Sequence, residues 1–279
     1  MSSSSQAPDV GALFQAAHED DAIGQQSLNA LQIVDLGAKI ADAMGTPADQ
    51  FQQSEVILLA ILVDNSGSIR FAGNSDAVRD GCNTIIGALT ESKQQDNIMA
   101  LIRLLSPISG MAGSEVLYPY GLIDDAPKLD QHNYNPNEGT PLYDETLVFL
   151  GSVLAKAQEY ADQGIPCRTI SLIITDGADQ HSPTHCGGRG TTPDKVKVLV
   201  EDMLRQENHI IGAMGIKDDD GVDYNLIFKS MGLRDEWIST PKSDPTSIRK
   251  QCQVFSQSAV RASQSAASFS QQALGGFGN

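Results

Sequence analysis

The chain has 279 residues, of which 41% are hydrophobic, so it is long enough to bury a large core and too apolar to be wholly disordered. It holds 35 acidic and 19 basic residues, which gives a net charge of −16. This balance argues against a nucleic-acid binder and against an anionic membrane surface, because both partners require clustered lysine and arginine.

Helical and extended patterns alternate along the chain. Helices are expected over 9–18 and 27–44, in an N-terminal segment (1–55) that carries eight acidic residues and one lysine. The apolar run 56–63 is typical of a strand buried on both faces. Further on we expect helices over 75–92, 142–163, 194–208 and 223–232, and strands over 97–105, 115–123, 168–175, 210–216 and 236–239.

These elements define a fold class. Strands 97–105 and 115–123 are too close in sequence for a helical crossover, so they should be antiparallel. The remaining strands alternate with helices, which favours parallel pairing. We therefore predict an α/β fold, in which an open, mostly parallel central sheet has one antiparallel edge strand and helices on both faces.

The C-terminal segment has a pattern of its own. From Pro245 onward, apolar and small residues recur every three or four positions in a background of serine and glutamine. This spacing predicts one continuous helix that packs on its own domain, and the alternative is a projecting helix that binds a partner. The stripe comprises Ile248, Cys252, Phe255, Ala259, Ala262, Ala266, Phe269 and Ala273.

The sequence carries no sign of export. Residues 1–10 contain neither the basic cluster nor the apolar stretch of a secretory signal. The apolar run 56–63 is too short to span a bilayer. The cysteines are scattered, without a Cys-x-x-Cys pair. We therefore expect a cytoplasmic protein with reduced thiols and no membrane insertion.

Oxygen-bearing side chains follow two of the predicted strands. Asp64 ends the first apolar strand, and Asp176 ends strand 168–175. In an open parallel sheet, ligands bind beyond the carboxyl ends of the strands, so the two carboxylates converge if these strands are neighbours. Ser66 and Ser68 add two hydroxyls in the loop after Asp64, and Thr140 offers a third.

This set contains only oxygen donors. Two carboxylates neutralise a divalent ion, and the hydroxyls add no charge. Such ligation suits Mg²⁺, Mn²⁺ or Ca²⁺ and disfavours structural zinc. We take Mg²⁺ as the expected cation, with Ca²⁺ and Mn²⁺ as alternatives. The other interpretation is that these serines and aspartates only cap loops and helix starts.

Three motifs resemble the von Willebrand factor A (VWA) domain. The stretches Asp64-x-Ser66-x-Ser68, Gly139-Thr140-Pro141 and Thr175-Asp176-Gly177 match its metal-ion-dependent adhesion site (MIDAS), in this order and on these elements. Residues 139–144 resemble the version common in stand-alone bacterial members.

The resemblance implies a Rossmann-like fold in which the first strand is central. It places a VWA-like domain over 56–245, after an acidic helical appendage (1–55) and before a C-terminal Ser/Gln/Ala-rich helix and flexible tail (246–279). An Asp or Glu of a protein partner would complete the metal shell. The resemblance also implies direct metal bonds from Ser66, Ser68 and Thr140, with Asp64 and Asp176 bound directly or through water.

The leading functional hypothesis is a metal-dependent protein-interaction domain without catalysis. Similar bacterial proteins serve AAA-type ATPase, kinase–phosphatase or stress-response systems, and such a system is the context expected by analogy. One alternative is a metal-dependent hydrolase, for which His132, His181 and His185 lie in loops as candidate general bases. Another is a structural module that self-assembles through its terminal helix.

A Gly-, Pro- and His-rich insertion over 178–193 falls beside the predicted metal centre. His181, His185 and Cys186 could hold zinc there together with Asp179, although their spacing matches no standard zinc motif.

Overall fold

A six-stranded sheet forms the centre of the computed structural model, which describes residues 9–32, 36–51, 53–107, 114–182, 189–217 and 221–277. The strands are β1 (Val56–Val63), β2 (Ile98–Leu104), β3 (Val116–Leu122), β4 (Cys167–Thr175), β5 (His209–Gly215) and β6 (Ile238–Ser239). Their order is β3-β2-β1-β4-β5-β6. β3 is antiparallel to β2 and all other pairs are parallel, which confirms the predicted sheet.

The central strand β1 shows why this sheet needs helices on both sides. All eight of its residues are buried. Val56, Leu58, Ala60 and Leu62 point into one hydrophobic cluster, and Ile57, Leu59, Ile61 and Val63 point into the other. Since successive side chains of a strand face opposite sides, an unbroken apolar run requires two covering layers.

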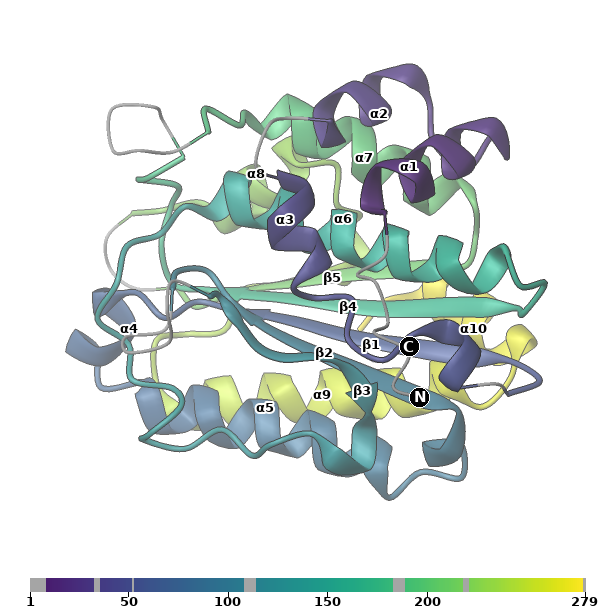
Figure 1. Ribbon diagram of the computed structural model, residues 1–279. Coiled ribbons are helices and arrows are strands. Elements are labelled where there is room, and N and C mark those ends of the chain that lie inside the picture. The colour runs from purple at the N-terminus through teal and green to yellow at the C-terminus, as the bar shows by residue number, and fades with distance from the viewer. Residues whose placement is uncertain are drawn as a thin grey trace.

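Figure 1 shows these layers above and below the sheet. The helices over the first face share one apolar cluster: α1 (Val10–Glu19), α2 (Gln25–Leu31), α3 (Leu36–Ala41), α6 (Leu142–Ala161), α7 (Pro193–Arg205) and α8 (Tyr224–Ser230). The second face is covered by α5 (Ser75–Thr90), α9 (Pro245–Ser263) and α10 (Ala266–Gly275). The short helix α4 (Gly67–Phe71) lies at the edge of the sheet where β1 ends. In the described part of the chain, no helix is long and apolar enough to cross a membrane.

The prediction of a single helix over 27–44 is wrong. The structure has two helices here, α2 and α3, and residues 33–35 lie outside the described residues. The two helices bury their apolar faces against different partners, since α2 packs on α7 and α3 packs on α6. Tertiary packing therefore decides how this stretch is divided, and helical spacing alone cannot show it.

The prediction of one continuous C-terminal helix is also wrong. Ser265 has an extended backbone (φ −165°, ψ 164°), and its hydroxyl accepts the N–H of Ser268 at 3.1 Å, so it ends one helix and caps the next. Ala266, in the middle of the stripe, is consequently exposed. The prediction that the stripe packs on its own domain is confirmed for its buried members Ile248, Cys252, Phe255, Ala259, Ala262 and Phe269.

Candidate metal centre

The candidate site lies at the carboxyl ends of β1 and β4. These strands are neighbours, as the prediction required, and Val63 pairs with Ile174, one residue before Asp64 and two before Asp176. The strand order reverses here, because β2 and β3 extend to one side of β1 while β5 and β6 extend beyond β4. Loops that leave such a point in opposite directions open a crevice for a ligand.

Two serine hydroxyls and one carboxylate meet at this point. Ser68 Oγ donates to Asp176 Oδ1 at 2.7 Å, and Ser66 Oγ lies 3.3 Å from the same oxygen. The two hydroxyl oxygens are 2.9 Å apart. Ser66 occupies the N-cap position of α4 but makes no side-chain cap hydrogen bond. The interpretation of Ser66 as a helix cap is therefore wrong, and its hydroxyl turns toward the carboxylate instead.

Asp64 is fully buried and held from both sides of its carboxylate. The Ser66 N–H donates to Oδ1 at 2.7 Å, and Thr175 Oγ1 donates to Oδ2 at 2.6 Å. Tyr134 Oη donates to the Asp64 carbonyl oxygen at 2.6 Å. These contacts fix the orientation of the Asp64 carboxylate and of its backbone carbonyl. Sequence reasoning missed Tyr134, because a lone tyrosine in a polar loop carries no recognisable pattern.

Thr140 is brought close to the loop after β4 from the loop before α6. It is 3% exposed, and a Cβ added to Gly177 would lie 3.2 Å from Thr140 Oγ1. Residue 177 follows Asp176 directly, so the missing side chain lets the two loops approach closely. All five predicted ligands thus gather at the carboxyl ends of the central strands β1 and β4.

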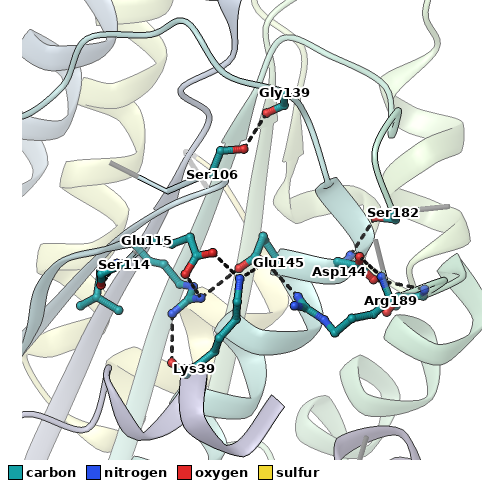
Figure 2. A network of polar contacts seen from close by, with 12 residues as sticks. Lys39, Ser106, Ser114, Glu115, Gly139, Asp144, Glu145, Ser182 and Arg189 are labelled. Atoms are coloured by element: carbon teal, nitrogen blue, oxygen red, sulfur yellow. Dashed lines mark hydrogen bonds and ion pairs between the residues drawn. The ribbon is translucent and has the colours of Figure 1, made fainter. Parts of the chain in front are cut away.

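Asn65 braces the loops that surround the site. Its side chain accepts the N–H of Ser106 at 3.0 Å and donates to the Ser106 carbonyl at 3.1 Å. Its own carbonyl accepts the N–H groups of Asn137 and Glu138. Ser106 Oγ in turn donates to the Gly139 carbonyl at 3.0 Å (Figure 2). The variable position between Asp64 and Ser66 is therefore structural, a role that the motif itself does not reveal.

The electrostatics of the site fit a cation. Burial raises the pKa of the Asp64 carboxyl, and burial together with the Asp64 charge raises the pKa of Asp176 to about 7. Across the described ranges, no lysine, arginine or histidine forms an ion pair with either carboxylate. Two buried carboxylates that no basic side chain compensates, surrounded by hydroxyls, form a donor set that suits a hard divalent ion.

The other candidate groups of the sequence are only partly visible. His185 and Cys186 lie outside the described residues. His181 Nδ1 accepts the Thr140 N–H at 2.9 Å, and Asp179 accepts the Tyr143 N–H at 3.1 Å. Among the residues with described positions, no cluster of three or more His, Cys, Asp or Glu side chains could hold a metal ion.

Comparison with known proteins bears on the fold. Neither a protein-family model nor a curated protein sequence matches this chain at a significant level. Among solved structures, the chain is similar to the pilus adhesin SpaC from Lactobacillus rhamnosus GG, with 13% identity and a TM-score of 0.51. The match covers 75% of this chain and only 30% of the SpaC chain.

Two weaker likenesses accompany it. Proximal thread matrix protein 1 from the mussel byssus has 16% identity and a TM-score of 0.48, over 74% of this chain and 46% of that one, and one structure of it has a zinc-occupied MIDAS motif. The manganese-loaded TRAP protein of Plasmodium vivax has 16% identity and a TM-score of 0.43, over 72% of each chain. The strand order and the likeness to SpaC together show that this chain has the Rossmann-like fold of a VWA domain.

Proposed function

We propose that this protein is a metal-dependent protein-interaction domain that binds an acidic side chain of a partner through a divalent cation. The observation that carries the proposal is the convergence of the Ser66 and Ser68 hydroxyls on Asp176, next to the buried Asp64. The residues that would hold the cation are Asp64, Ser66, Ser68, Thr140 and Asp176.

The burial of these residues suggests how a partner would approach. Asp64 and Asp176 lie at the base of the site, where they are 0% and 7% exposed, whereas Ser68 is exposed at its rim. Thr175 and the Ser66 N–H keep the Asp64 carboxylate in place. When bound, a hard divalent cation supplies a Lewis acid that accepts an outside carboxylate as a further ligand. The exposed rim is the side from which that carboxylate can arrive.

The identity of the cation and the cellular context belong to the same proposal. Mg²⁺ is the proposed resident ion, because the donors are few, hard and mainly uncharged. The stretch 139–144, with its resemblance to stand-alone bacterial members, supports a cytoplasmic adaptor in an ATPase, kinase–phosphatase or stress-response system. No catalysis by the domain itself is part of the proposal.

Isothermal titration calorimetry with Mg²⁺, Mn²⁺ and Ca²⁺ tests the metal centre. We expect wild-type protein to bind at one site, and Asp64→Ala and Ser66→Ala to lose that binding while circular dichroism shows an intact fold. Asp96→Asn is the matched control, because this aspartate is exposed and lies before β2, away from the candidate site.

Affinity purification then tests the interaction. Partners that wild-type protein captures in Mg²⁺ should be lost in EDTA and in the Asp64→Ala protein, and kept by Asp96→Asn. Capture that survives both EDTA and Asp64→Ala would show that the interaction does not depend on a metal.

A further inference from the structure

We propose that His181 is a positioning residue of the candidate metal centre, which fixes the loop that carries Thr140. The inference rests on the proposed function, since it concerns how one of the proposed ligands is held. His181 lies in the insertion over 178–193, in the same loop as Asp176 but outside every motif of the site.

Both backbone polar groups of Thr140 are bound by this insertion. The Thr140 N–H donates to His181 Nδ1 at 2.9 Å, and the Thr140 carbonyl accepts the Gln180 N–H at 3.0 Å. An imidazole nitrogen that accepts a hydrogen bond is unprotonated, so the ring proton of neutral His181 is on Nε2. The orientation of Thr140 is thus set by the loop that supplies Asp176.

The imidazole ring also packs against the residue before Thr140. A Cβ on Gly139 would lie 2.7 Å from both Cε1 and Nδ1 of His181, closer than atoms of these types approach. The absence of a side chain at Gly139 therefore leaves the space that the His181 ring occupies. This contact provides a second way of displacing His181 without changing the histidine itself.

The same insertion caps helix α6, whose own N-cap residue Pro141 makes no side-chain cap hydrogen bond. Asp179 accepts the Tyr143 N–H at 3.1 Å, and Ser182 Oγ accepts the Asp144 N–H at 3.0 Å. The backbone N–H groups of the first helical turn have no partner within the helix, and these two side chains accept hydrogen bonds from them. The start of α6 and the loop after β4 are therefore held together independently of His181.

Asp144 completes this connection from the helix side. Its carboxylate accepts the backbone N–H of Arg189 at 2.7 Å and that of Thr191 at 3.1 Å (Figure 2). Because Asp179, Ser182 and Asp144 anchor the insertion, loss of the His181 ring should leave the insertion in place. What should change is the position of Thr140, and through it the affinity for a metal.

Titration calorimetry with MgCl₂ and MnCl₂ separates this role from simple packing. We expect His181→Ala to bind either ion about 10- to 100-fold more weakly, the usual effect of losing a residue that orients a metal ligand by a hydrogen bond. His181→Asn should restore most of the affinity, because the amide oxygen can accept the Thr140 N–H. His132→Ala, which removes an exposed histidine from the preceding polar loop, should bind like wild type.

The Gly139 contact adds a double-mutant test. Gly139→Ala should weaken metal binding on its own, because the new methyl group displaces the ring. In a His181→Ala background the same substitution should cost little more, since there is no ring left to displace. Two residues that act through one contact give such non-additive effects.

Amide hydrogen exchange of the metal-free protein tests the role of His181 without any bound metal. In EDTA, the Thr140 amide should exchange with solvent faster in His181→Ala than in wild type, with protection restored in His181→Asn and thermal stability nearly unchanged.

The outcomes that overturn the inference are distinct from failure of the proposed function. If wild type binds neither ion, the proposed function fails and the role of His181 fails with it. If wild type binds but His181→Ala binds equally well, only the role of His181 is overturned. It is also overturned if His181→Ala and His181→Asn lose affinity and stability alike, because that result describes a packing residue.

Discussion

Asp176 is the residue whose surroundings bear most directly on the candidate metal centre. The residue is 7% exposed, and its carboxylate lies beside Asp64 and has hydroxyls as its side-chain hydrogen-bond donors. Burial and the neighbouring charge raise its pKa to about 7, so at pH 8 the ionised group destabilises the metal-free folded state relative to the unfolded chain.

Removing this charge should therefore stabilise the metal-free protein. We expect Asp176→Asn to raise the free energy of unfolding at pH 8 in EDTA by on the order of 2 kcal/mol, measured by urea denaturation. Added Mg²⁺ should then stabilise wild type but not the variant. Asp96→Asn should behave like wild type in both conditions. A variant that is less stable than wild type in EDTA would contradict this account of the site.

His209, at the start of β5, makes folding depend on pH. It is buried, Nδ1 is 2.7 Å from Thr169 Oγ1, and Nε2 has no hydrogen-bond partner in the described part of the chain. Burial lowers its pKa to about 3, whereas in an unfolded chain the pKa of histidine is about 6.5. Between these values the unfolded state binds a proton that the folded state does not.

Acidification should therefore reduce stability through this residue. From pH 6.5 downward, the His209 contribution to the free energy of unfolding should fall by up to about 1.4 kcal/mol per pH unit. Urea midpoints measured from pH 7 to pH 4 should show a shallower loss in His209→Gln than in wild type. The exposed His132→Gln variant should follow wild type, and an equally steep loss in His209→Gln would refute the assignment.

The residues of the candidate site differ in how far the sequence reveals them. Asp64, Ser66, Ser68, Thr140 and Asp176 could be predicted, because they end apolar strands or lie in recognisable motifs, and the structure gathers them as expected. Asn65 and Tyr134 could not, because each makes its contacts with residues far away in the sequence. The sequence offers His181 only as a candidate zinc ligand or general base, and its contact with the Thr140 N–H is likewise invisible there. Such contacts have no local spacing, and only the folded chain shows them.

At the scale of elements, a buried ion cluster joins helices α3 and α6 to the sheet. Glu145 on α6 accepts from Arg103 of β2 at 2.9 Å, from Lys39 of α3 at 3.2 Å and from Arg189 at 2.8 Å (Figure 2). Glu115 pairs with the same lysine and with Arg103. Burial raises the pKa of Glu145, but the three cations together bring it below its usual value.

Glu145→Gln tests the importance of this cluster. We expect a loss of about 3–5 kcal/mol in the free energy of unfolding, because the substitution removes the carboxylate that the fully buried Arg103 shares with Lys39 and Arg189. Guanidinium denaturation followed by circular dichroism measures it. Glu201→Gln is the control, since Glu201 forms an exposed pair with Lys197 at 3.7 Å and should change stability by less than about 0.5 kcal/mol. Equal losses in the two variants would show that the buried cluster stabilises the fold no more than an exposed ion pair does.

Helices and strands could be predicted from the sequence where one hydrophobic pattern continues over the whole length of the element. The apolar strands β1 and β4 are the clearest cases, because burial on both faces leaves little room for polar residues. Stretch 27–44 and the C-terminal stripe were divided differently, since helical spacing is nearly continuous across both breaks. A capping serine such as Ser265 does not stand out among many serines.

At the scale of the whole molecule, α10 closes the second face of the sheet. Phe269 is 1% exposed in the cluster beneath the sheet, and Trp237 Nε1 donates to the Ala273 carbonyl at 3.2 Å. The Trp237 ring lies 5.0 Å from that of Phe277 and 6.4 Å from that of Phe255. The apolar side of the terminal helix is therefore used within the molecule.

Replacing one of these side chains should destabilise the whole domain. Phe269→Ala is expected to cost about 3–5 kcal/mol, and fluorescence of Trp237, the single tryptophan, should report the unfolding. Leu274→Ala is the matched control, because Leu274 is on the same helix and 74% exposed. If instead Leu274→Ala changes the mass seen by light scattering and Phe269→Ala leaves stability unchanged, the helix serves assembly and not the core.

The position of the candidate metal centre means that it can form only after β4 has been synthesised and has paired with β1. Ser66 and Asp176 are 110 residues apart in the chain, and only the pairing of β1 with β4 brings them together. A nascent chain that ends before Asp176 has the first carboxylate and the serines but cannot assemble the site. Closing so long a loop is entropically costly before the sheet forms. A cation bound at this position would therefore report that β1 and β4 have paired, because a chain without that pairing lacks the complete set of proposed ligands.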